Sequence, residues 1–164
     1  MAVLDILRIP DERLKRQAQP VEDVAAIQGF IDDMLETMYQ TSDGIGLAAT
    51  QVGSTHAVIV IDLSEERNSP TVVINPQIVE QDGEYEGEEG CLSVPGYYAK
   101  VKRYSRVKVV SLDREGNEQI FDTDEFLAIV LQHEIDHLKG KIFIEHLSSM
   151  KQQMALKKVR KLKD

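Results

Sequence analysis

The stretch Gln132-His133-Glu134-Ile135-Asp136-His137-Leu138-Lys139-Gly140 combines two imidazoles with a carboxylate at helical spacing. In a helix, His133 and His137 are four residues apart, so their side chains lie within about 40° of each other and can reach one metal ion. Glu134 points about 100° round from His133, which suits a base acting on metal-bound water better than a third ligand. This stretch therefore indicates a metal site carried by a helix.

The residues before the histidines predict that this helix is buried. Apolar positions at spacings of three and four lead into the histidines, and they are Phe126, Ile129 and Val130. Two acidic residues precede them, as is common at a helix start, and Gly140 follows where a helix end favours glycine. We therefore expect both histidines to face the interior.

Two buried histidines also have a second interpretation, as hydrogen-bonded core residues, and a third metal ligand is needed to decide. Cys91 is the single cysteine, so an internal disulfide is impossible. A lone thiol in a reducing compartment is a buried hydrophobe, a nucleophile or a metal ligand. The glycine, serine and proline residues around Cys91 indicate irregular backbone rather than a core face. The role of a metal ligand fits Cys91 best, because the two histidines need a third ligand to complete a metal site.

Length and charge narrow the class of protein. The 164 residues are enough for one domain, 1–164, that buries a hydrophobic core without cross-links such as disulfides. The formal net charge of -9 argues against nonspecific binding of DNA or other nucleic acid by the body of the protein. No apolar run approaches the length of a membrane span, and the acidic N-terminus does not resemble a signal peptide. We expect a cytoplasmic protein that does not enter a membrane.

The hydrophobic pattern predicts an α+β fold. Mainly antiparallel β-sheets are expected to pack around the central metal-binding helix, with an N-terminal amphipathic helix and a C-terminal helix. The N-terminal helix covers residues 24–39, and the C-terminal helix begins near Met150. The expected strands are 57–62, 71–75, 77–80, the hairpin 106–113 with 119–123, and a short one within 141–146. The acidic run 84–89 is expected to be a solvated face.

Residues 44–53, Gly-Ile-Gly-Leu-Ala-Ala-Thr-Gln-Val-Gly, are almost all small or apolar. They fit a loop in which glycine permits unusual backbone angles. They equally fit a surface that a substrate backbone can approach closely, where the Gln51 amide is available to a developing oxyanion. The residues of this segment support the two interpretations equally.

Three separated blocks resemble the peptide deformylase family closely. They are 44–51 (GIGLAATQ), 89–93 (EGCLS) and 132–137 (QHEIDH), in the family's order and at ordinary spacings. The opening 9–14 (IPDERL) also resembles the family's start, so the likeness covers essentially the whole chain. Tyr97 and Tyr98, just past the second block, lie in a stretch that varies within the family.

The resemblance implies a metallohydrolase that removes the formyl group from the N-terminal formylmethionine of newly made polypeptides and releases formate. Cys91, His133 and His137 would hold one divalent metal, iron(II) in the cell, with nickel, cobalt or zinc accepted. Glu134 would act as general base and then general acid as metal-bound water attacks the formyl carbon. The metal, the Gln51 amide and the backbone N–H of Leu92 would hold the oxyanion.

The resemblance also implies that the nascent peptide adds as a strand near Ile45, Gly46 and Gly90. The methionine pocket is expected to consist of Ile45, Phe126, Ile129 and Val130, although each of these residues equally fits plain helix core. The basic C-terminal helix fits a solvated helix docked on the body, or a contact with ribosomal RNA.

Two other functions remain possible at this point. A metallopeptidase shares the His-Glu-x-x-His pattern, and it would take its third ligand downstream, where Glu145 and His146 are the candidates. A metal-sensing protein would close the fourth coordination position, and it would leave Gln51 and Glu134 without a role.

Overall fold

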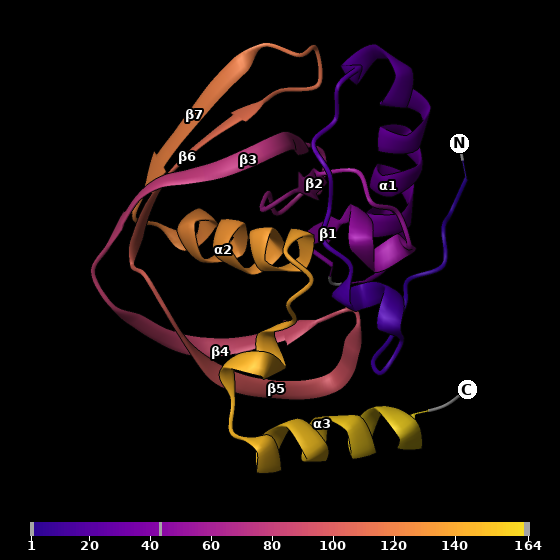
Figure 1. Ribbon diagram of the computed structural model, residues 1–164, viewed down its shortest axis with the longest axis vertical. Helices are drawn as coiled ribbons and strands as arrows, with labels where there is room; N and C mark the ends of the chain where they lie inside the picture. The colour runs from indigo at the N-terminus through magenta and orange to yellow at the C-terminus, as the bar shows by residue number, and fades with distance from the viewer. Residues whose placement is uncertain (1, 43, 163–164) are drawn as a thin grey trace.

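A computed structural model describes residues 2–42 and 44–162 of the chain and places helix α2 (Phe126–Leu138) at its centre. Figure 1 shows α2 lying between two sheets, with α1 (Gln28–Gln40) to one side and α3 (Ser149–Lys161) beneath the second sheet. The α+β fold expected from the sequence, with its N-terminal and C-terminal helices, is confirmed. None of the helices in the described part of the chain has the length and apolar composition that a membrane crossing requires.

The larger sheet has five antiparallel strands in the order β1-β2-β3-β6-β7. Their bounds are β1 Gly46–Ala48, β2 Val58–Ile61, β3 Thr71–Asp82, β6 Arg106–Leu112 and β7 Glu118–Thr123. The second sheet is the hairpin of β4 (Tyr85–Cys91) and β5 (Val94–Arg103). The expected strand 57–62 and the expected hairpin 106–123 are confirmed as β2 and as β6 with β7.

Helix α2 is buried because it packs against both sheets. Ala128, Leu131 and Ile135 belong to the cluster that joins α2 to the larger sheet. On the side of the hairpin, Phe143 joins the cluster formed with β5 and α3, and its ring stacks on that of His133 at 6.0 Å. Buried residues lie on more than one side of α2, and a helix of this kind is stable only in such an enclosed position. The metal-ligand pattern is therefore fixed between two sheets.

Gly140 ends α2 in the left-handed region, at φ 79°, where its N–H donates to the carbonyl of His137. A Cβ at this position would collide with the carbonyl oxygen of Lys15. The expected role of this glycine at the helix end is confirmed.

Strand β3 corrects the expectation of two strands, 71–75 and 77–80, separated at Pro76. The chain continues through Pro76 because Asn75 adopts φ 53°, and the register with β6 shifts between Ile74 and Gln77. The Asn75 side chain accepts from the N–H of Val21 and donates to its carbonyl, which holds this bulge in place. The missing N–H of proline is tolerated at such a bulge.

Four other segments differ, wholly or in part, from what the sequence indicated. Glu86, Glu88 and Glu89 belong to strand β4. Glu84, Glu86 and Glu88 are exposed, as expected of a solvated face, but Glu89 is buried. The expected strand within 141–146 is a 3-10 helix, Phe143–His146, because the Glu145 carboxylate accepts from the N–H of Ile142 and closes a turn. Residues 44–53 fitted either a loop or a surface for a substrate backbone; within them, Gly46–Ala48 forms β1 and Ala49–Val52 forms a 3-10 helix. The expected helix 24–39 begins as a 3-10 helix, Val24–Ile27, and continues as α1.

Asp62, directly after β2, ties the start of the larger sheet to α1. Its carboxylate accepts hydrogen bonds from the Tyr39 hydroxyl at 2.6 Å and from the N–H groups of Ser64 and Ser69 at 2.8 and 3.0 Å. Burial opposes ionisation of this group, but the donors of Ser64, Tyr39 and Ser69 outweigh it and lower the pKa of Asp62 from 3.8 to about 2. The ionised form is therefore part of the folded state.

Asp62→Asn is expected to lower the free energy of unfolding by about 1–2 kcal/mol at pH 7, since hydrogen bonds to a charged group are lost. The pKa of Asp62 is lower in the folded than in the unfolded chain, so its stabilisation is complete above pH 4 and disappears as the pH falls toward 2. Urea unfolding of both proteins from pH 7 to pH 2.5 measures this difference. A difference that stays constant over that range would contradict the assignment.

Candidate metal centre and active site

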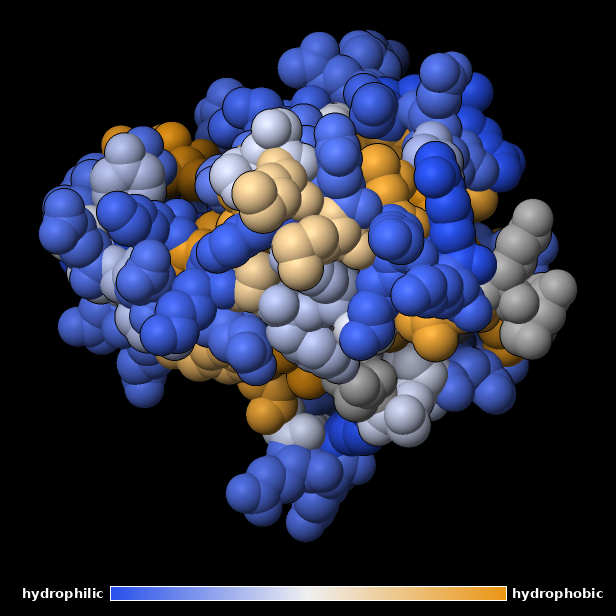
Figure 2. All heavy atoms as spheres, turned by 90° about the horizontal axis from the view of Figure 1, so that it is seen from below, coloured by the Kyte–Doolittle hydropathy of each residue, from blue (hydrophilic) through white to orange (hydrophobic). Residues whose placement is uncertain are grey.

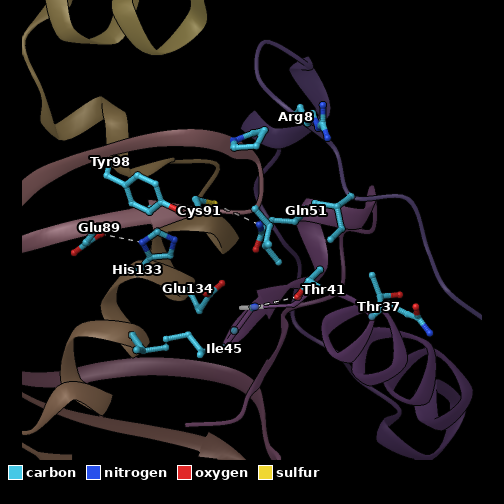
Figure 3. Close-up of a pocket in the computed structure, with 18 of the residues that line it drawn as sticks. Arg8, Thr37, Thr41, Ile45, Gln51, Glu89, Cys91, Tyr98, His133 and Glu134 are labelled. Carbon is cyan, nitrogen blue, oxygen red and sulfur yellow. Dashed lines mark hydrogen bonds and ion pairs between the residues drawn. The ribbon is translucent and has the colours of Figure 1, made fainter. Parts of the chain in front are cut away.

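Cys91, His133 and His137 bring three metal-ligand atoms together. Cys91 is the last residue of β4, not part of irregular backbone, and both histidines project from α2. Their ligand atoms all lie within 4.8 Å of one another, and Cys91 Sγ is 3.3 Å from His137 Nε2. Figure 3 shows the Cys91 and His133 side chains beside Gln51 and Glu134 around one space. The end of β4 and the middle of α2 thus form one candidate metal centre.

The imidazole of His133 is oriented by a buried carboxylate. His133 Nδ1 lies 2.9 Å from Glu89 Oε1, and Arg103 donates to both oxygens of Glu89 at 2.8 Å. Burial opposes ionisation of Glu89, but Arg103 and His133 outweigh it and lower the pKa of Glu89 to about 2. An ionised Glu89 fixes the proton on Nδ1 and leaves the lone pair of Nε2 for a metal.

Arg103 extends this network to the surface, since its guanidinium also donates to Asp136 Oδ2 at 2.6 Å. His146 Nε2 lies 3.0 Å from the same oxygen of Asp136. The sequence pattern assigned no role to Glu89, Arg103 or Asp136. One signal was available: Glu89 is two residues before Cys91, and recognition of β4 as a strand would have indicated that both face α2.

The electrostatics of Cys91 favour a metal-binding thiolate. Burial raises the pKa of a thiol, but the imidazoles of His137 and His133 outweigh this and hold the pKa of Cys91 well below its usual value. The thiolate is the form that binds metals. A thiolate with two imidazoles is a donor set that suits divalent zinc, iron and related ions, and three protein ligands leave one position for chemistry. The residues present therefore fit a catalytic metal ion.

Glu134 lies beside this centre with one oxygen free. It is buried, and in the described part of the chain its Oε1 has no hydrogen-bond partner. Burial raises the pKa of Glu134, and the neighbouring imidazoles oppose this only in part. A Cβ on Gly46 would lie 2.7 Å from Glu134 Oε2. Glycine at position 46 therefore lets the carboxylate lie against β1.

Gln51 is held so that its amide N–H points at the candidate metal centre. Its Oε1 accepts from the N–H of Ala48 at 3.0 Å, which directs Nε2 to the other side. Nε2 donates to Ser93 Oγ at 3.1 Å and lies 3.5 Å from Cys91 Sγ. Leu92, whose backbone N–H is the other candidate donor, follows Cys91 in the turn between β4 and β5.

A cavity of about 630 Å³ opens onto these groups. Its lining includes Cys91, His133, Glu134, Gln51 and Leu92, whereas His137 is fully buried behind them. The six residues expected to bind substrate also line it, and they are Ile45, Gly46, Gly90, Phe126, Ile129 and Val130. Ile129 and Val130 form the deeper wall, and Ile45 and Phe126 are half exposed at the rim.

The two downstream candidates for a third ligand do not join this group. Glu145 accepts from the backbone of Ile142, and His146 contacts Asp136. Among the described residues, the group that could hold a metal ion is Cys91, His133 and His137, so this donor set differs from that expected of a metallopeptidase.

Comparison with known proteins places the chain among close relatives. The sequence model for polypeptide deformylase matches residues 3–153. Peptide deformylase 3 of Shewanella oneidensis is 74% identical over 98% of this chain and 99% of the relative. The chain belongs to the peptide deformylase family. The resemblance and the enzyme class expected from the three sequence blocks are thereby confirmed.

Solved structures of peptide deformylases have the same fold. The Legionella pneumophila peptide deformylase superposes with a TM-score of 0.94 at 46% identity, covering 99% of this chain and 96% of that one. The Ehrlichia chaffeensis peptide deformylase in complex with actinonin gives a TM-score of 0.93 at 42% identity, covering 99% of both chains. The likeness covers 99% of this chain, so the candidate centre lies in a backbone framework that these structures share.

Proposed function

We propose that this peptide deformylase acts in the cytoplasm on newly made polypeptides and removes the formyl group from their N-terminal formylmethionine. The observation that supports this most directly is the convergence of Cys91, His133 and His137 with Glu134 and Gln51 on one cavity. This arrangement offers metal ligands, a base and an amide donor to one substrate carbonyl. Both products, formate and a free amino terminus, follow from hydrolysis of that amide.

Cys91, His133 and His137 would hold one divalent metal ion, iron(II) in the cell, with nickel, cobalt or zinc accepted by purified protein. When bound, the ion supplies Lewis-acid chemistry, because it lowers the pKa of water from 15.7 toward about 7 and polarises a carbonyl oxygen. Glu89 and Arg103 keep His133 in the tautomer that binds metal. The thiolate of Cys91 leaves a 2+ ion with a net charge of +1.

Glu134 carries the proton through the reaction. It takes a proton from the attacking water while the new C–O bond forms at the formyl carbon. It returns that proton to the amine nitrogen as the C–N bond breaks, and formate leaves. A raised pKa suits this double role, because a carboxylate that is easier to protonate gives and takes a proton near neutral pH.

The oxyanion that develops on the formyl oxygen needs donors fixed in advance. Gln51 Nε2 is oriented by Ala48 and Ser93, and the backbone N–H of Leu92 lies in the adjacent turn. Donors held in a water-poor site cost no reorganisation when the charge appears, which is why each lowers the barrier by about 3 kcal/mol.

Two sheet edges flank the cavity and suit an extended peptide. β1 is an edge strand of the larger sheet, and β4 pairs on one side with β5. Gly46 of β1 and Gly90 of β4 both line the cavity, and neither has a side chain that would keep a peptide backbone away. Hydrogen bonds to the peptide backbone do not depend on the peptide's sequence. The preference for an N-terminal methionine therefore comes from the methionine pocket, which is formed by Ile45, Phe126, Ile129 and Val130.

The C-terminal helix α3 supports two interpretations of its charge. Ala155 and Val159 are buried against the body, and its exposed side carries Lys151, Lys157, Lys158, Arg160 and Lys161. Figure 2, which views the molecule from the side of α3, shows a mainly hydrophilic face with scattered hydrophobic areas. A solvated helix docked on the body accounts for this pattern, and ribosome contact stays a proposal.

Mass spectrometry of formyl-Met-Ala-Ser after incubation with the metal-loaded enzyme tests the proposed function. The expected product is the intact tripeptide without its formyl group, together with formate. Cleavage between methionine and alanine would instead identify a metallopeptidase.

Gln51→Ala is expected to lower kcat by about 10²- to 10³-fold, with a smaller rise in KM, because the lost amide donor acts on the transition state. Steady-state kinetics on formyl-Met-Ala-Ser separate the two constants. Metal content and the urea unfolding midpoint of the variant control for damage to the centre or the fold. A change confined to KM would contradict a transition-state role.

A further inference from the structure

Tyr98 of β5 is an exposed aromatic side chain at the edge of the active-site cavity. More than half of its surface, 57%, is accessible to solvent, and the residue lines the cavity. Its ring lies directly on Gly90, where a Cβ would come within 2.6 Å of the ring atom Cδ1. Figure 3 draws Tyr98 among the side chains that line the cavity. No step of the proposed reaction uses this residue.

The pleat of the hairpin assigns Tyr98 to one of its two faces. Glu89 points toward α2, where it contacts His133. Side chains alternate along a strand, so Glu88 and position 90 face the other way. Glu88 is opposite Lys100 in the register, and Tyr98 shares the face of Lys100. The hairpin therefore has an inner face toward α2 and an outer face that carries Tyr98.

An added peptide strand along β4 follows the same alternation. The methionine side chain points to the inner face, because the pocket residues Ile129 and Val130 belong to α2. The next side chain then points to the outer face, beside the Tyr98 ring over Gly90. We propose that Tyr98 is a specificity-determining residue that selects an aromatic or large apolar side chain directly after formylmethionine, an inference that rests on the proposed deformylase function.

The chemistry of this position favours an apolar partner. A ring that is more than half exposed loses water contact when a second ring or a large aliphatic group packs on it, and aromatic pairs add an attraction of their own. A small residue such as alanine reaches little of the ring. The contact is therefore worth about 3- to 10-fold in kcat/KM between phenylalanine and alanine at this position.

A purely structural role for Tyr98 is the alternative, because aromatic rings also cover glycines in strands. Tyr85 provides a control for the loss of a ring that covers a strand glycine. Its ring covers Gly87 of the same strand, where a Cβ would lie 2.7 Å from Cε1, and 43% of its surface is exposed. Glu88 and Glu89 separate Gly87 from the Gly90–Cys91 end of β4. Removal of the Tyr85 ring thus exposes Gly87, a strand glycine that lies away from the proposed position of the peptide's second residue.

The test compares kcat/KM for formyl-Met-Phe-Ser and formyl-Met-Ala-Ser in the metal-loaded protein. Wild-type protein is expected to prefer the phenylalanine peptide by about 3- to 10-fold. Tyr98→Ala should reduce this ratio to near one, Tyr98→Phe should keep it, and Tyr85→Ala should leave it unchanged. The ratio cancels any loss of folded or metal-loaded enzyme, so partial misfolding of a variant does not affect it.

Three outcomes would overturn the inference. They are a wild-type ratio near one, a ratio that Tyr98→Ala leaves intact, and an equal loss of the ratio in Tyr85→Ala. In each of these cases formate is still released, so the proposed function stands. Absence of formate from both peptides with metal-loaded wild-type protein would overturn the proposed function itself.

Discussion

Glu134→Gln is expected to lower kcat for formyl-Met-Ala-Ser by about 10²- to 10⁴-fold while the protein keeps its metal, because glutamine cannot carry the proton from water to the leaving amine. The two side chains have nearly the same shape, so the contact with Gly46 remains. In the described chain no group donates a hydrogen bond to Glu134 Oε1, so the substitution leaves no donor of the surrounding protein unpaired at that oxygen. Steady-state formate release and metal analysis of the same preparation measure the two expectations.

Glu125→Gln is the matched control for this variant. Glu125 directly precedes α2, is exposed and does not line the cavity. Its replacement changes the net charge by the same amount, and it should leave turnover unchanged. Full activity in Glu134→Gln would remove this residue from the reaction, and loss of metal from that variant would reassign it to the metal centre.

Cys91→Ala is expected to abolish metal-dependent turnover, because two imidazoles without the thiolate bind a divalent ion much more weakly. The charge of the site also changes, since the lost thiolate is favoured by His133 and His137. Dialysis against iron(II) or nickel, followed by metal analysis and a formate assay, tests both consequences. His56→Ala, which removes an exposed histidine outside the group, should retain metal and activity. Unchanged metal content in Cys91→Ala would contradict the three-ligand assignment.

The local features of the fold could be predicted from the sequence because short-range patterns determine them. The apolar spacing before His133 and the glycine at position 140 give α2 its bounds to within a residue or two. The hairpin of β6 and β7 follows from alternation on both sides of a turn. Features that depend on contacts between residues far apart in the sequence could not be predicted from such patterns. The bulge at Asn75 depends on a hydrogen bond to Val21, which lies 54 residues away.

In the candidate site, too, the features set by local sequence could be predicted and those set by long-range contacts could not. Cys91 and the two histidines could be named because their residue types and spacing match a chemical purpose, and the structure brings their ligand atoms together. The supporting ion pairs could not be named. Arg103 meets Glu89 only because β5 folds back on β4, and it meets Asp136 only because the hairpin packs on α2. Seen in the sequence, Glu89 is one acid among four. The catalytic and substrate-binding roles of the lining residues stay predictions.

Formate release from formyl-Met-Ala-Ser by the unaltered chain is the most direct test of the central claim. The protein would be prepared anaerobically, because iron(II) beside a thiolate exposes both to oxidation, stripped with a chelator, and reloaded with iron(II) or nickel. We predict no turnover without metal and full turnover when each chain holds one ion. Equal turnover by the stripped protein, or none by protein shown to hold one ion per chain, would contradict it.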